Sequence, residues 1–347
     1  MPILLPCLLA FNLGAPAQVP APPKAAAPAY SLRLLKTLPV GGEGGWDYLA
    51  VDAETGRLFV PRGSRVMVLS LEGKPLGEIP NTQGVHGVAL ARDLDRGYTS
   101  NGRSNSMTVF KLSTLEVLAE VKTTGENPDA ILYDAATRQV FTFNGRGKNA
   151  TVFDAVSLAV KATLPMGGKP EFSACDGRGR VFVNVEDTAE LLAIDAKALK
   201  IEARWSLKPL EDPTGLGIDA AGQRLFAVGR NKLMAVVDAR TGKLLAQVPI
   251  GAGCDGAAFD AGTGDAYASN GEGTLTVVHG DSQGRFTVTA TVPSKKGART
   301  LVVNEKNHCV YLPTAEWGPV PEAKDGKPAR APMLPGSFQI VVVGPAQ

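Results

Sequence analysis

The chain has 347 residues and a formal net charge of +2, from 36 basic and 34 acidic residues that are well mixed. This near balance gives no strong signal of a nucleic-acid protein that is held by phosphate contacts. No segment reaches the roughly 20 consecutive apolar residues that a membrane-spanning helix needs, so no membrane span is expected. The 39 glycines and 25 prolines supply many turns between short runs rich in Val, Ile, Phe and Tyr, which favours an all-β fold.

The first 29 residues differ in composition from the rest of the chain. An apolar run over 3–11 precedes the small residues Ala15, Pro16 and Ala17, and a Pro/Ala-rich stretch follows. This pattern is typical of a secretory signal followed by a linker, although no Lys or Arg precedes the apolar run. We therefore predict a signal peptide over 1–17, a linker over 18–29 and one domain over 30–347, in a periplasmic or secreted protein.

An aromatic residue recurs through that domain at intervals of 39 to 44 residues. The seven positions are Phe59, Tyr98, Phe141, Phe182, Phe226, Tyr267 and Tyr311. Each lies in the same frame of four short apolar segments separated by turns. A period of roughly 40 residues with four strands per unit is typical of a β-propeller, whereas a helical solenoid would show 3.6-residue apolar spacing. The sequence predicts seven blades of four antiparallel strands.

The two ends of the domain each lack part of a blade. Residues 30–40 resemble the fourth, outermost strand of a unit whose first three strands are missing, and the last unit ends after its strand over 338–343. We predict that the N-terminal strand completes the last blade, because this pairing closes the ring and removes two exposed strand edges.

Alignment of the repeats also aligns the residue that enters each innermost strand, at one mouth of the expected channel. These entry residues are Asp47, His86, Asp129, Glu171, Thr214, Asp255 and Arg299. Converging carboxylates repel one another unless protons or cations compensate them. One hypothesis is a divalent metal, with calcium as the first choice and with manganese, zinc or iron allowed by the imidazole. The other is a wide polar funnel filled with water, in which the carboxylates stay solvated.

The loops that follow the aromatic strands form a second layer at the same mouth. Asn144 and Asn270 stand in Asn-Gly pairs that are ordinarily turn formers, yet their repetition on one face suggests further metal ligands. Arg103, Arg146 and Arg230 in these loops are candidates to bind a carboxylate or phosphate group of a substrate. The candidate substrate-binding residues are Arg103, Arg230 and Arg299, with Trp46 and Trp317 as an apolar wall. Trp317 belongs to an unusually long loop over 315–336.

Several segments resemble the YncE-like, or YVTN-repeat, β-propellers of bacteria. They read YTSNGRSNSMTVF, ENPDAILYDAATRQVFTFNGRGKNATVFDA, GGKPEF and DARTGKLLAQVPIG. The resemblance extends over residues 30–347, although variants such as Phe182-Val183-Asn184 replace the literal YVTN tetrad. It implies an exported seven-bladed protein and does not define an activity.

A looser similarity in site chemistry exists to the gluconolactonase and paraoxonase propellers, in which a channel calcium polarises a lactone or phosphotriester. Those proteins have six blades, so only the chemical idea transfers. By analogy, His86, Glu171, Asp129 and Arg146 are the candidate catalytic residues, and the candidate metal ligands are Asp47, His86, Asp129, Glu171, Asp255, Asn144 and Asn270.

Two functions remain open at this point. The first, slightly favoured, is a monomeric, metal-dependent hydrolase of small esters, lactones or phosphoesters. The second is a propeller without catalytic activity that binds a small ligand or a protein partner.

Overall fold

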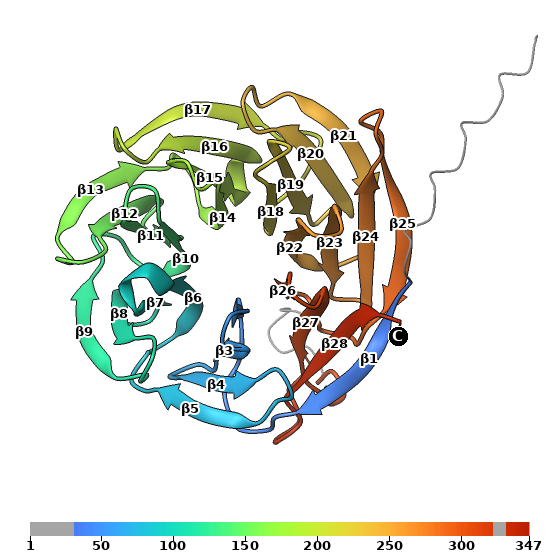
Figure 1. Cartoon of the computed structure of the whole chain (residues 1–347), viewed down its shortest axis with the longest axis horizontal. Helices are drawn as coiled ribbons and strands as arrows, with labels where there is room; N and C mark the ends of the chain where they lie inside the picture. The colour runs from blue at the N-terminus through green and yellow to red at the C-terminus, as the bar shows by residue number, and fades with distance from the viewer. Residues whose placement is uncertain (1–30, 322–330, 347) are drawn as a thin grey trace, which may run out of the picture.

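The computed structural model describes residues 31–321 and 331–346. Seven four-stranded antiparallel sheets surround a central channel as the blades of a propeller (Figure 1). The predicted fold class is therefore confirmed. Within the described residues the only helices are two short 3-10 turns, η1 (Arg92–Leu94) and η2 (Glu186–Thr188). The predicted signal peptide and linker over 1–29 lie outside the described residues.

Blades one to three follow the chain from the innermost strand outward. Blade one contains β2 (Ala50–Asp52), β3 (Arg57–Pro61), β4 (Val66–Ser70) and β5 (Pro75–Ile79). Blade two contains β6 (Val85–Ala91), β7 (Arg96–Asn101), β8 (Ser106–Lys111) and β9 (Val117–Lys122). Blade three contains β10 (Pro128–Asp134), β11 (Gln139–Asn144), β12 (Asn149–Asp154) and β13 (Val160–Pro165).

Blades four to six repeat the same order. Blade four contains β14 (Pro170–Cys175), β15 (Arg180–Val185), β16 (Glu190–Asp195) and β17 (Lys200–Ser206). Blade five contains β18 (Leu216–Asp219), β19 (Arg224–Gly229), β20 (Leu233–Asp238) and β21 (Leu244–Pro249). Blade six contains β22 (Cys254–Asp260), β23 (Asp265–Asn270), β24 (Thr274–Gly280) and β25 (Phe286–Pro293).

Blade seven is built from both ends of the chain. It contains β26 (Val302–Asn304), β27 (Cys309–Thr314), β28 (Gln339–Pro345) and, as its outermost strand, β1 (Leu32–Pro39). β1 pairs antiparallel with β28 from Leu32 opposite Pro345 to Pro39 opposite Gln339. The prediction that the N-terminal strand closes the ring is therefore confirmed.

The repeated aromatic residue occupies the second strand of every blade. All seven of these side chains are between 0% and 2% exposed. The apolar clusters around them join neighbouring blades: Phe141 of blade three, for example, packs in one cluster with Val181 and Ile194 of blade four. A blade buries its apolar faces only against its neighbours, so the periodic aromatic is a requirement of the ring as a whole.

Four innermost strands are bulged at their first residues. The register of β6, β10, β14 and β22 against the second strand shifts at the entry residues His86, Asp129, Glu171 and Asp255. A bulge places two residues opposite one and turns a side chain away from the regular alternation. The bulge therefore lets each of these strands direct a polar side chain to the channel mouth. The residues that follow resume the regular alternation, in which successive side chains point to opposite faces of the sheet.

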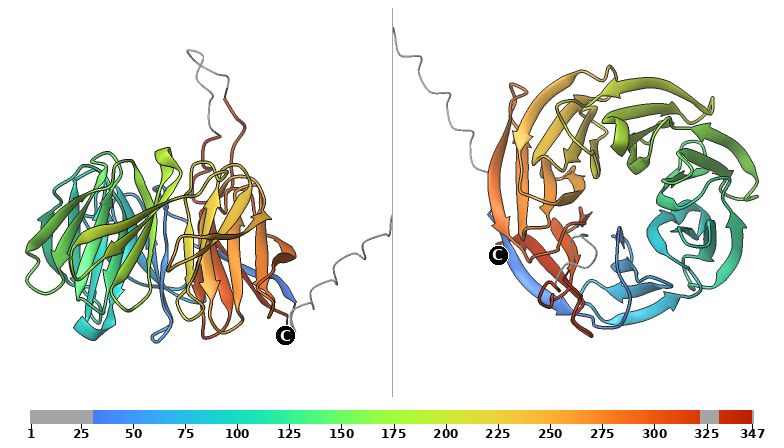
Figure 2. Two further views of the ribbon diagram at one scale, coloured as in Figure 1. Left: turned by 90° about the horizontal axis from the view of Figure 1, so that it is seen from above. Right: turned by 180° about the vertical axis from the view of Figure 1, so that it is seen from behind.

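The long loop between β27 and β28 leaves the ring on one face, as the edge-on view shows at its described flanks (Figure 2). A short bridge between Trp317 and Met333 joins the two flanks. Trp317 packs against Trp46 with ring centroids 5.7 Å apart, and Trp46 packs against Phe338 at 5.2 Å. These contacts hold the base of the loop beside the start of blade one.

The closure of the ring predicts a strong effect of one side chain in β1. Leu38 is 6% exposed and packs in a cluster with Leu58 of blade one and Ile340 of β28. We expect Leu38→Ala to lower the free energy of unfolding by about 2–3 kcal/mol, the usual effect of removing a buried Leu side chain. Lys36→Ala is the matched control, because Lys36 lies in the same strand and is exposed. Urea unfolding measures both variants, and equal stabilities would contradict the closing role of β1.

Candidate functional site

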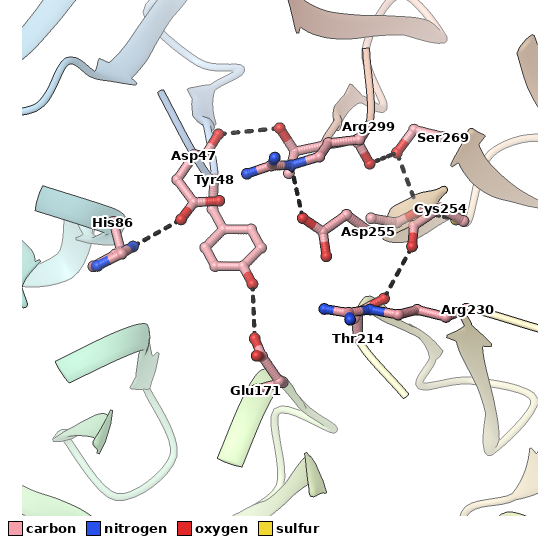
Figure 3. A network of polar contacts seen from close by, with 12 residues as sticks. Asp47, Tyr48, His86, Glu171, Thr214, Arg230, Cys254, Asp255, Ser269 and Arg299 are labelled. Carbon is pink, nitrogen blue, oxygen red and sulfur yellow. Dashed lines mark hydrogen bonds and ion pairs between the residues drawn. The ribbon is translucent and has the colours of Figure 1, made fainter. Parts of the chain in front are cut away.

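The entry residues lie at the channel mouth and form separate groups there. Figure 3 shows Asp47 and His86 on one side of the mouth and Asp255 and Arg299 on the other. Thr214 takes no part in either group: its hydroxyl donates to the backbone carbonyl of Cys254 at 3.3 Å, and its side chain is buried. The seven entry residues therefore do not form one cluster, and each group has its own contacts.

The tightest group unites blades one, two and three. His86 Nδ1 lies 2.7 Å from Asp47 Oδ2 and 3.5 Å from Asp129 Oδ1. One ligand atom from each of these three residues lies within 4.8 Å of the others. All three side chains are partly buried, with 28%, 16% and 13% of the His86, Asp47 and Asp129 side chains exposed. We call Asp47, His86 and Asp129 the carboxylate–histidine cluster.

The cluster favours a protonated imidazole when it holds no cation. Burial alone would lower the pKa of His86, but the hydrogen bond to Asp47 and the charges of Asp129 and Asp47 outweigh burial and raise the pKa to about 9. Burial, with the charge of Asp47, raises the pKa of Asp129. The cluster therefore holds a proton between carboxylates, at a position that a metal cation would otherwise occupy.

A second group is centred on blade four, and its members Lys169 and Glu186 were not found from the sequence. Lys169 donates hydrogen bonds from Nζ to Glu171 Oε1 and to Glu186 Oε2. Arg230 adds an ion pair to Glu186 Oε1 at 3.1 Å. Burial and the charge of Asp129 raise the pKa of Glu171 despite Lys169. Burial alone would also raise the pKa of Glu186, but its hydrogen bonds with Lys169 and Glu171 and the charges of Lys169 and Arg230 together lower it. Glu171 and Arg230 thus have charged partners inside the protein.

The third group joins blades six and seven. Arg299 Nε lies 2.9 Å from Asp255 Oδ2. Burial raises the pKa of Asp255 even with this partner. Burial alone would lower the pKa of Arg299, but the charges of Asp255, Asp47 and Tyr48 and the hydrogen bond to Asp255 together raise it. Asp255 is therefore compensated within the protein and is not part of the carboxylate–histidine cluster.

Tyr48 spans the channel between these groups (Figure 3). Its hydroxyl donates to Glu171 Oε2 at 3.3 Å, and its ring packs against Phe172 with centroids 4.7 Å apart. Burial, reinforced by Asp129 and Asp47, raises the pKa of Tyr48 well above its usual range, so the phenol keeps its proton and remains a donor. A residue of blade one thereby contacts blade four, and the side chain fills part of the channel.

Asn144 and Asn270 serve as anchors of their own loops. Asn144 Nδ2 donates to Asn149 Oδ1 at 2.7 Å and to Thr151 Oγ1 at 2.9 Å. Asn270 Nδ2 donates to Thr274 and Thr276 at 3.0 and 2.9 Å. Both side chains are 0% exposed. These contacts place the amide groups between the second and third strands of a blade. This structural role explains why Asn recurs in the repeat, and no metal ligand is needed to explain it.

A pocket of about 580 Å³ opens at the mouth over blades one to three. Its lining includes Trp46, His86, Arg103, Arg146 and Arg299, together with Asp47. Trp317 packs on Trp46, and its indole nitrogen donates to the carbonyl oxygen of Lys296 at 3.3 Å. The pocket thus gathers most of the residues that the sequence suggested for substrate binding, while Arg230 pairs with Glu186 outside its lining.

The arrangement limits which residues can hold a metal together. Of the seven candidate ligands, the structure brings Asp47, His86 and Asp129 within reach of one ion. Asp129 Oδ1 is buried and has no hydrogen-bond partner, although it lies 3.5 Å from the imidazole nitrogen. A cation would supply the interaction that this oxygen lacks. The residues present therefore fit a divalent cation with two carboxylate ligands and one imidazole ligand.

Comparisons with known proteins support the fold. No family model and no curated protein matches the sequence, so the resemblance to the YncE-like family is not confirmed. The solved structures of RRP9 WD40 repeats and of U3-55K are both 12% identical, with TM-scores of 0.74 and 0.72. The matches cover 92% and 91% of this chain, respectively, and 99% of each of the two similar chains.

A third similar structure is the hydrazine synthase of Kuenenia stuttgartiensis. It is 13% identical with a TM-score of 0.66, and the match covers 79% of this chain and 92% of that one. Identities this low show a shared propeller fold and no more. Among the described residues, no helix is long and apolar enough to cross a membrane.

The raised pKa of His86 predicts a pH dependence of stability in protein freed of divalent cations. Because the pKa rises from 6.5 to about 9 on folding, the stabilisation is complete below pH 6.5 and is lost as the pH increases through 9. Allowing for partial exposure of the side chain, we expect a loss of about 1–2 kcal/mol over this interval. Glu171, whose pKa is also raised, acts in the same direction.

Urea unfolding at both ends of this pH interval measures the effect. In His86→Gln the fall in stability with rising pH should be smaller than in the wild-type protein, because Gln does not titrate. Equal slopes in the two proteins would show that the imidazole is not held protonated by its carboxylate neighbours.

Proposed function

We propose that the channel mouth is the active site of a cation-dependent hydrolase of small esters, lactones or phosphoesters. The observation that supports this proposal is the convergence of Asp47, His86 and Asp129 from three blades to within 4.8 Å beside a pocket of about 580 Å³. Three protein ligands are typical of catalytic metal sites, which keep a further position open for water or substrate.

The chemistry of the cluster narrows the choice of cation. Calcium prefers six to eight oxygen ligands, whereas a site with an imidazole also suits manganese, zinc or iron. We therefore favour one of these three over calcium, the first choice from the sequence. When bound, such a cation supplies Lewis acidity and a nucleophilic water at neutral pH.

The surrounding residues would prepare the site for hydrolysis, in which a water oxygen bonds to the acyl carbon or phosphorus, the bond from that atom to the alcohol oxygen breaks, and the alcohol oxygen takes up a proton. His86 would be held in place by Asp47 Oδ2 at 2.7 Å. Tyr48 would keep the mouth from opening freely into the channel below, since it reaches Glu171 on blade four. Glu171 has its own charged partner, Lys169, and would act through Tyr48 rather than on the substrate.

A second candidate is a propeller that binds a ligand or protein without turnover. The observation that favours it is the internal compensation of the mouth, because Lys169 pairs with Glu171 and Glu186 and Arg299 pairs with Asp255. A mouth compensated in this way needs no cation to stay folded. The similar structure titled as RRP9 WD40 repeats fits this interpretation at the level of fold.

We also propose that the protein is exported, on the strength of the apolar run and small residues at the start of the chain. Intact-mass analysis of the protein recovered from the native host tests this. Loss of the residues up to 17 supports export, and a mature chain that retains them contradicts it.

The proposed reaction predicts that metal content and turnover depend on the same three residues. Protein purified without added cations should contain close to one metal ion per chain, and chelation should abolish hydrolysis of chromogenic esters, lactones or phosphoesters until one cation restores it. His86→Ala and Asp129→Ala should each weaken metal binding by at least about a hundredfold, because each removes a ligand of the cation. Elemental analysis and steady-state kinetics measure the two effects.

Glu126→Gln is the matched control, because Glu126 lines the pocket and is not part of the carboxylate–histidine cluster. It should keep its metal and its activity. Protein without metal and without turnover, which still binds a ligand at the mouth, would reject the hydrolase in favour of the binding propeller.

A further inference from the structure

The charged residues of the mouth fall into a compensated side and an open side. On blades four to seven, Glu171, Glu186 and Asp255 each accept a hydrogen bond or ion pair from Lys169, Arg230 or Arg299. On blades two and three, Arg103 and Arg146 line the pocket, and within the described residues neither guanidinium group has a hydrogen-bond or ion-pair partner. Unpaired cationic groups are therefore concentrated on the side that holds His86 and Asp129.

The two arginines occupy the same place in adjacent repeats. Each is the third residue of an Asn-Gly-Arg segment, 101–103 in blade two and 144–146 in blade three. In each segment the Asn side chain is buried and donates to a Thr of the third strand, from Asn101 to Thr108 at 2.8 Å and from Asn144 to Thr151 at 2.9 Å. The base of each arginine is thereby fixed, while its guanidinium group remains exposed at the pocket.

The glycine of the first segment brings the loop close to the candidate metal site. A Cβ atom at Gly102 would lie 2.7 Å from His86 Nε2, a distance that real side chains do not adopt. Only glycine lets the backbone press against the imidazole in this way. Arg103 therefore starts one residue from direct contact with the carboxylate–histidine cluster.

The acidic residues of the pocket leave these arginines available. Asp47 is paired with His86 and Arg299 with Asp255, so Glu126 is the remaining acidic group in the lining against two unpaired arginines. A guanidinium group presents parallel N–H donors that match the oxygens of a carboxylate or a phosphate. Two such groups beside one pocket form an oxyanion site, which a neutral ligand would not use.

We infer that the substrates of this pocket carry a carboxylate or phosphate group, which Arg103 and Arg146 bind while the scissile bond lies at the carboxylate–histidine cluster. This inference deepens the proposed function and rests on it for the position of the reacting bond. The two arginines select the substrate class, and the cluster carries the reaction.

Titration calorimetry at low ionic strength with inorganic phosphate and with malonate tests the oxyanion site directly. We expect binding to the wild-type protein and a loss of about tenfold in affinity for each of Arg103→Gln and Arg146→Gln, because each removes one charge-assisted contact. Arg178→Gln is the matched control: Arg178 is an exposed arginine in the turn between β14 and β15, away from the mouth. The tighter of the two probes identifies the oxyanion class.

The kinetic arm compares an ester that carries a carboxylate with its neutral analogue. The inference is supported if the arginine variants lose kcat/KM for the anionic ester, keep it for the neutral analogue and contain as much metal as the wild-type protein. Unchanged affinity for both probes in Arg103→Gln and Arg146→Gln overturns it, whatever the turnover. The protein could also hold no metal and show no turnover, yet bind phosphate or malonate in a way that depends on the two arginines. This result would reject the hydrolase and support the oxyanion site.

Discussion

Seven blades can enclose one channel only if the two ends of the chain meet, and the pairing of β1 with β28 within blade seven makes that contact. The same closure positions the mouth. Shortly after β1 the chain reaches Asp47, whose carbonyl oxygen accepts a hydrogen bond from Thr300 of blade seven at 3.1 Å, while Tyr48 N donates to the carbonyl oxygen of His86 at 3.1 Å. Asp47 is thus held between blades seven and two. The approach of its carboxylate to His86 follows from ring closure rather than from any local motif.

The convergence of acidic residues at one mouth is costly unless each has compensation, and the protein supplies it in two ways. Around Glu171 and Asp255 the compensation is a lysine or arginine of the same or the next blade. Around Asp47 and Asp129 it is a single imidazole whose nitrogen lies between both carboxylates. A permanent guanidinium or ammonium cannot be exchanged for a metal, whereas the proton on an imidazole can. The side of the mouth with Asp47 and Asp129 is therefore suited to bind a cation, whereas the side with Glu171 and Asp255 is already neutralised by the protein.

The repeat predicted most of the fold, because residues at equivalent positions in a propeller occupy equivalent places. The period gave the number of blades, and the register gave the face on which His86 and Asp129 lie. It could not show which entry residues meet. Which entry residues meet depends on side chains at other positions of the repeat, such as Lys169 two residues before Glu171, and on Tyr48, whose partner lies 123 residues away.

The sequence does contain a signal for Tyr48. The residue after the entry residue is small in several blades, at Gly87, Ala130, Gly215 and Gly256, but it is Tyr48 in blade one and Phe172 in blade four.

The Asn-Gly-Arg segments separate the requirements of the fold from those of a ligand. In a sevenfold repeat a structural requirement recurs around the ring, as the buried aromatic does, and Asn anchors recur in blades two, three and six. The third residue of the segment does not follow this rule. In blade six it is Glu272, whose carboxylate accepts a hydrogen bond from the backbone nitrogen of Ala252 at 3.0 Å and so serves the blade. Arg103 and Arg146 make no such contact within the described residues. Because the fold does not need them, their place beside His86 and Asp129 is better explained by what enters the pocket.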